Sequence, residues 1–186
     1  MGVDPDTVDL NVQRPTPGIE HTDFQISRQF TYLVRKVALV RKAHDLKGRL
    51  KDLPADKTND WAQNPQFVEI GTSIGRWLET LPRDLQVIFP SDGAVPWVPS
   101  HFVGNLHSYF HLTRLMLHRP QIMDQNAWRD GSWKVHMAAC SDSSQKMCKL
   151  QEGILQSFGI NGLLCMQRGI NFTIYAVLTC TMVHLV

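Results

Sequence analysis

Cysteine is scarce in this sequence, and neither sign of charge is in large excess. The four cysteines (Cys140, Cys148, Cys165 and Cys180) include no CxxC pair, which argues against a disulfide framework or a zinc site. We therefore expect free, buried thiols in a reducing compartment. A net charge of +2 supplies no broad basic field of the kind that would by itself predict nucleic-acid binding.

Export signals and membrane-length apolar runs are lacking as well. The N-terminus carries Asp4, Asp6 and Asp9 and no apolar core of a signal peptide, so we expect an intracellular protein. The segment Ile170–Val186 has no formal charge, but it includes polar residues and is at the lower limit for crossing about 30 Å of hydrocarbon. A buried helix is therefore favoured over a membrane span.

Strand signals are weak throughout the sequence, and phosphate-binding glycine loops of the common types are absent from it. The 186 residues, of which 43% are apolar and 19% charged, fit one soluble domain with a substantial core. Residues 1–20 are rich in proline and acidic side chains and predict a disordered leader. Residues 21–186 predict an irregular all-α domain of about five main helices.

The first expected helix carries one apolar stripe along roughly 30 residues and is closed by Pro54. A coiled-coil seam is the alternative, and it would make the chain a dimerisation scaffold. A basic face lies between the apolar positions, and we expect water rather than DNA or an acidic partner to cover it. The apolar positions are Phe24, Ile26, Phe30, Leu33, Val37, Val40, Ala43, Leu46, Leu50 and Leu53.

The second helix is expected to begin at Pro65 and to end before Pro82. The third, Ser100–Ile122, has the widest apolar face, which predicts a place at the centre of the core. Ser100 is its expected N-cap, and Pro120 is its expected end because proline cannot donate to the helical ladder.

The remaining segments are expected to alternate between connections and helices. A proline-rich loop should pack onto the core through Trp97, and a polar connection should follow the third helix. A long helix should end at a glycine turn, and a last apolar helix should run to the chain end, which suggests a fragment of a longer protein. The loop is Phe89–Pro99 and the polar connection is Asp124–Ser132. The long helix is Trp133–Phe158, the glycine turn is Gly159–Gly162, and the last helix runs from near Leu163 to Val186.

Two patterns point to enzyme chemistry. The run Gly71-Thr72-Ser73-Ile74-Gly75 matches the G-x-S-x-G nucleophile elbow of hydrolases. That turn joins a strand to a helix in a parallel sheet, whereas the helix expected from Pro65 passes through Ser73. His107 and His111 are four residues apart, as metal-ligating pairs are, but Ser108 stands where a glutamate base would follow the first histidine. Partly buried or surface histidines without a metal are the simpler interpretation, and from the residues alone we expect no enzyme.

Two linked segments resemble a known family. Trp77-Leu78-Glu79-Thr80-Leu81-Pro82, followed by Leu85, resembles the W…LP..L segment of fungal binuclear-zinc-cluster transcription factors. Leu106-His107-x-Tyr109 and Leu115-x-Leu117-His118-Arg119-Pro120 resemble the LH..Y….L.LHRP helix of the same middle homology region. The resemblance covers about Asp23–Val186. Two later segments, Ile154–Gly162 and Gly169–Val186, further resemble the acetate-utilisation and gluconeogenesis activators of filamentous fungi.

The resemblance implies a regulatory domain in the nucleus that controls carbon-source genes. DNA would be bound only through a zinc cluster outside this chain, because such a cluster needs six closely spaced cysteines. No cofactor or membrane is implied for the chain itself, while the transcription machinery, co-regulators or a second copy are implied partners. The residues carried over are structural ones: Trp77, Leu81, Pro82, Leu106, Tyr109, Leu117, His118, Arg119 and Pro120.

Overall fold

The computed structural model describes residues 21–50, 65–123, 125–164 and 170–184. Six α-helices make up most of these residues, and five of them have fifteen residues or more, which confirms the all-α prediction. In chain order they are α1 (His21–Leu50), α2 (Pro65–Thr80), α3 (His101–Ile122), α4 (Gln125–Asp130), α5 (Trp133–Leu164) and α6 (Ile170–His184). The leader 1–20 and the end of the first stripe beyond Leu50 lie outside the described residues.

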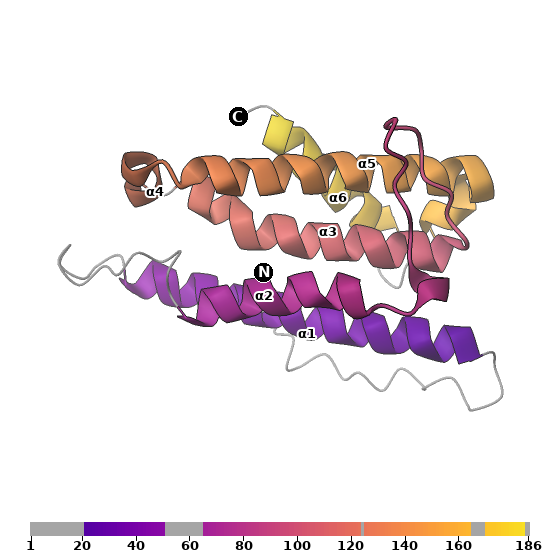
Figure 1. The fold of residues 1–186 in the computed structure, drawn as a ribbon, viewed down its shortest axis with the longest axis horizontal. Coiled ribbons are helices and arrows are strands. Elements are labelled where there is room, and N and C mark those ends of the chain that lie inside the picture. The colour runs from indigo at the N-terminus through magenta and orange to yellow at the C-terminus, as the bar shows by residue number, and fades with distance from the viewer. Residues whose placement is uncertain (1–20, 51–64, 124, 165–169, 185–186) are drawn as a thin grey trace.

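Four long helices run alternately in opposite directions (Figure 1). Helix α3 lies in the middle, with α1 and α2 on one of its sides and α5 on the opposite side. Helix α6 lies behind α3 and α5 in this view and is packed against α5. As a result α3 is enclosed on several sides, and 14 of its 22 residues are buried. The expectation that this helix occupies the centre of the core is confirmed.

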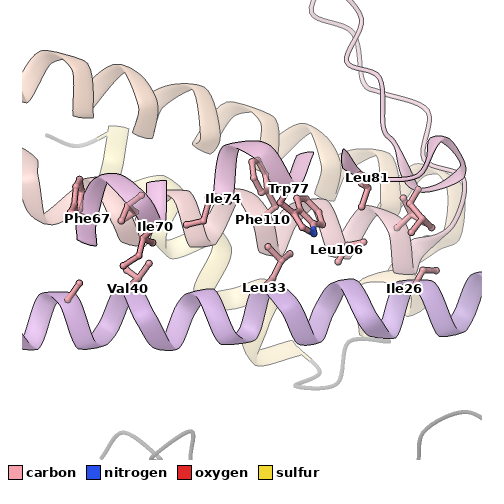
Figure 2. Close-up of a cluster of buried hydrophobic side chains, with 14 residues drawn as sticks. Ile26, Leu33, Val40, Phe67, Ile70, Ile74, Trp77, Leu81, Leu106 and Phe110 are labelled. Atoms are coloured by element: carbon pink, nitrogen blue, oxygen red, sulfur yellow. The ribbon is translucent and has the colours of Figure 1, made fainter. Parts of the chain in front are cut away.

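The apolar stripe of α1 packs inside the chain. Ile26, Leu33, Val40 and Ala43 belong to a buried cluster formed with α2 and α3 (Figure 2). The basic side chains Arg28, Arg35, Arg41 and Lys42 of the same helix are exposed. The coiled-coil alternative loses its main support, because a dimer would have to use a surface other than these four buried residues.

Two glycines allow close contacts with α5, Gly104 between α3 and α5 and Gly153 between α5 and the loop before α3. A Cβ atom added to Gly104 on α3 would lie 2.7 Å from Ile154 of α5, and one added to Gly153 would lie 2.9 Å from the carbonyl oxygen of Pro96. Real Cβ atoms essentially never come this close, so a side chain at Gly153 would clash with the backbone, and one at Gly104 would require Ile154 to shift. The loop before α3 is thus clamped against α5 through Pro96 and Val98, which are both buried.

Trp97 is not the anchor of that loop. Its side chain is 76% exposed, whereas its neighbour Val98 is 2% exposed. In an extended segment neighbouring side chains point to opposite sides, so the burial of Pro96 and Val98 turns the tryptophan outward. The expectation that Trp97 packs onto the core is wrong, although the loop itself does pack there.

Three boundaries differ from expectation. The segment expected to be a polar connection contains α4, which is followed by Gly131 in a left-handed conformation at φ 81°. Gly159 interrupts α5 as expected, with φ 64°, but helical residues resume and continue to Leu164. The last helix begins at Ile170 rather than near Leu163. The expectation that it is buried is wrong for much of its surface, because Ile174, Tyr175, Val177, Leu178 and Met182 are exposed. Among the described residues, no helix is both long and apolar enough to cross a bilayer.

Candidate functional site

The two segments that carry the family resemblance meet at the C-terminal end of α2. The Trp77 ring stacks on Phe110 of α3 with 5.1 Å between ring centroids, and it meets His107 edge-on at 6.1 Å. A 3-10 turn, Arg83–Leu85, follows α2, and the carbonyl oxygen of Leu85 lies 2.8 Å from Nε2 of His107. Because a carbonyl can only accept, the imidazole donates and Nε2 carries the proton. The motif residues therefore form one packed unit.

Most residues of the resemblance are structural in their placement. Trp77, Leu81, Leu106 and Leu117 are buried in the cluster between α1, α2 and α3. Tyr109 is half-buried and meets Phe30 of α1 edge-on, with ring centroids 6.1 Å apart. The others are half-buried or exposed: Pro82, His118 and Pro120 are half-buried, and Arg119 is exposed in the last turn of α3.

Pro120 does not end α3, which continues to Ile122. Proline has no N–H to donate to the carbonyl of Met116, four residues earlier, so that carbonyl would be left without a helical partner. Nε2 of His44, on α1, lies 2.9 Å from the Met116 oxygen and fills this position. The prediction that the helix ends at Pro120 is wrong because a side chain from another helix replaces the missing donor.

We expect this replacement to be measurable by a double-mutant cycle. His44→Leu should destabilise the chain by about 1–3 kcal/mol, because the carbonyl of Met116 becomes a part-buried acceptor without a donor. In a Pro120→Ala background the same change should cost less, because the alanine has a backbone N–H that can donate to Met116. Urea unfolding of the four proteins measures the coupling. Equal costs in both backgrounds would contradict this account of Pro120.

The two histidines proposed as a metal pair are buried and line the same cavity on α3. His107 is 1% and His111 2% exposed, so the expectation of partly buried or surface histidines understates their burial. Burial lowers the pKa of both, that of His111 to about 3, with weaker contributions from His107, Lys146 and Arg114. Nε2 of His107 is already bonded to Leu85, and the described residues contain no group of three His, Cys, Asp or Glu side chains placed to hold a metal ion.

A second histidine pair joins α3 to α5. Nδ1 of His118 lies 2.9 Å from Nδ1 of His136, so one ring must donate and the other accept. Burial lowers the pKa of His118 to about 4, and His136 and Arg114 contribute to the same shift. Sequence reasoning missed this pair because its members are 18 residues apart on different helices. No local spacing marks such a contact.

A cavity of about 270 Å³ opens beside His107 and His111. Its apolar wall consists of Leu78, Val87, Phe89 and Phe110, and its charged lining consists of Glu79, Arg114 and Lys146. The cavity therefore combines a small apolar body with two cations from neighbouring helices, which is the composition of a small-ligand site.

The two cations are held in position by one carboxylate outside the cavity lining. Nη1 of Arg114 lies 2.9 Å from Oδ2 of Asp142, and Nζ of Lys146 lies 2.9 Å from Oδ1. These contacts lower the pKa of Asp142 despite the opposing effect of burial, while Lys146 also lies over the Phe89 ring at 5.7 Å. Sequence reasoning missed the cavity because its lining comes from α2, the following loop, α3 and α5.

Ser73 lies in the middle of α2 rather than on a turn. Its hydroxyl donates to the carbonyl oxygen of Ile70 at 2.8 Å, and its own carbonyl accepts from the Tyr32 hydroxyl at 3.3 Å. A groove between α1 and α2 is lined in part by Ser73, and none of the residues that line it is a histidine. The helix that was expected to pass through Ser73 is confirmed, and the geometry of a nucleophile elbow is absent there.

Cys165 lies outside the described residues, and the other three cysteines are free thiols that are not all buried. Cys140 and Cys180 are buried, whereas Cys148 is exposed. A hydrogen bond between Cys148 on α5 and Cys180 on α6 lowers the pKa of Cys148 to about 7 and raises that of Cys180. The expectation of buried thiols is therefore wrong for Cys148.

Comparison of the chain with protein-family models, with curated proteins and with solved structures gives no match.

Proposed function

We propose that the chain is the regulatory domain of a fungal binuclear-zinc-cluster transcription factor, acting in the nucleus on carbon-source genes. One observation carries the proposal: the W…LP..L and LH..Y segments form a single packed unit around Trp77 and His107. The ring contact between Trp77 and Phe110 and the hydrogen bond from His107 to Leu85 join the two segments, which explains why they occur together in one sequence.

A cavity next to this unit supports a regulatory role more than a scaffold role. His107 and Phe110 belong both to the packed unit and to the lining of the cavity. A ligand that enters the cavity would therefore contact the residues that join α2 to α3. Binding free energy would be coupled to the packing of these helices, as a regulatory domain requires.

The test joins the 186-residue chain to an unrelated DNA-binding domain and measures a reporter gene in fungal cells grown on different carbon sources. We expect reporter expression to change with the carbon source, and the DNA-binding domain alone serves as the control. Expression equal to that control on every carbon source would contradict the proposal. Genomic sequence upstream of Met1 supplies a second check, since it should encode six clustered cysteines.

Covalent labelling with a serine-reactive probe tests the alternative that the chain is an enzyme. A serine nucleophile at Ser73 would react with a fluorophosphonate probe, and the Ser73→Ala variant would not. We expect no difference between the two proteins, because the Ser73 hydroxyl is bonded within its own helix.

A further inference from the structure

The cavity beside α3 has a charge distribution that points to one class of ligand. The ionisable side chains that line it are Arg114, Lys146 and Glu79, together with the two buried histidines. Burial keeps the histidines neutral at pH 7, so the lining carries one net positive charge. Glu79 is exposed, whereas the side chains of Arg114 and Lys146 are 33% and 38% exposed. Water therefore screens the glutamate more than the two cations.

Both cations retain donors that can bind a ligand. A guanidinium has five N–H donors and an ammonium has three, and Asp142 accepts one from each. Across the part of the chain that the structure describes, these two groups have no other hydrogen-bonding partner. An anion placed between them would receive charge-assisted hydrogen bonds from α3 and α5 together.

His111 supplies an independent sign that the site is incomplete. It lines the same cavity, three residues before Arg114 on α3, and within the described ranges neither of its ring nitrogens has a hydrogen-bond partner. A buried imidazole normally satisfies at least one nitrogen, and an unpaired ring of this kind calls for a water, an ion or a ligand in the cavity. Nδ1 of His107, also at the cavity, lacks a partner in the same way.

We propose that this cavity binds a small organic monocarboxylate between Arg114 and Lys146. Its carboxylate meets the two cations, and its apolar part packs against Leu78, Val87, Phe89 and Phe110. The volume of about 270 Å³ fits a small ligand, and the carboxylates of Glu79 and Asp142 beside the two cations disfavour a second carboxylate on it. The inference names the effector class of the proposed regulatory function. That the cavity binds a monocarboxylate does not depend on the proposed function; only the regulatory consequence of binding rests on it.

Benzoate is a suitable probe because it joins one carboxylate to one apolar ring. We expect benzoate to bind the 186-residue chain saturably in calorimetry, with benzamide, its neutral counterpart, at least about tenfold weaker. Terephthalate, with two carboxylates, should also bind more weakly. Equal affinity for benzoate and benzamide, or no saturable binding of benzoate to a chain whose circular dichroism is helical, would overturn the proposal.

Two variants with opposite expected effects separate a built site from non-specific binding. Arg114→Gln should weaken benzoate binding at least about tenfold. Asp142→Asn should strengthen it several-fold, because the competing carboxylate is gone while both cations remain. Lys134→Gln, which removes an exposed cation of α5 outside the cavity lining, should change nothing. Unchanged affinity in Arg114→Gln or Asp142→Asn would overturn the assignment of the site.

Binding and regulation are tested by different readouts, so their failures are distinguishable. Calorimetry on the isolated chain tests the cavity, and the reporter measurement tests the transcriptional role. If the chain binds benzoate but the reporter does not respond to the carbon source, the proposed site stands and the proposed function is wrong.

Discussion

Replacing Trp77 by alanine should destabilise the chain by about 3–5 kcal/mol, which is a large part of the stability of a typical domain. The indole is 4% exposed, stacks on Phe110, and donates from Nε1 to the Gln29 side-chain oxygen at 2.7 Å. Its removal leaves a void between α1, α2 and α3 and an acceptor on α1 without its donor (Figure 2). Chemical denaturation followed by circular dichroism measures the loss.

Trp97→Ala is the matched control, because it removes the same side chain from a position that is 76% exposed. We expect it to change the free energy of unfolding by less than about 0.5 kcal/mol. Trp77→Phe should fall between the two, since phenylalanine keeps a ring against Phe110 but cannot donate to Gln29. Similar losses for Trp77→Ala and Trp97→Ala would show that Trp77 is not the anchor of the core.

The contrast between the buried Trp77 and the exposed Trp97 illustrates which features of the fold could be predicted from the sequence. Periodic spacing placed the helices well because apolar side chains at three- and four-residue steps share one helix face. Ser100 was also predictable as an N-cap, and its hydroxyl does accept from the amide of Val103 at 3.2 Å. Local rules of this kind depend only on neighbours in the chain.

Features that depend on distant residues were not predictable. Proline stops a helix by local rules, yet α3 passes Pro120 because His44 supplies a donor to Met116, 72 residues away along the chain. The candidate cavity has the same origin, since Arg114 and Lys146 are brought together by the close packing of α3 on α5. Spacing did place His107 and His111 on one helix, but it could not show that both are buried in the interior.

Acid should destabilise this chain well above the pH at which its carboxylates protonate. Burial lowers the pKa of His111 to about 3 and that of His118 to about 4, against about 6.5 in the unfolded chain. The unfolded state therefore binds protons first as the pH falls, so stability is complete above pH 6.5 and is lost below it. Each of these two histidines lowers the free energy of unfolding by about 1.4 kcal/mol per pH unit below pH 6.5. By pH 4 each should therefore have cost the chain about 3 kcal/mol of stability.

His111→Gln removes one of these contributions, because glutamine keeps a polar side chain of similar length and does not titrate. We expect its free energy of unfolding, measured in urea at intervals between pH 7 and pH 4.5, to fall less steeply than that of the parent chain, while His107 and His118, whose pKa values burial also lowers, keep part of the slope. His118→Gln should reduce the slope by a similar amount. Asp142 adds little in this window, because its unfolded pKa of about 3.9 lies below it. A parent chain with equal stability at pH 7 and pH 4.5 would mean that His111 and His118 are accessible to water, and the closed packing of α3 between α2 and α5 would then be wrong.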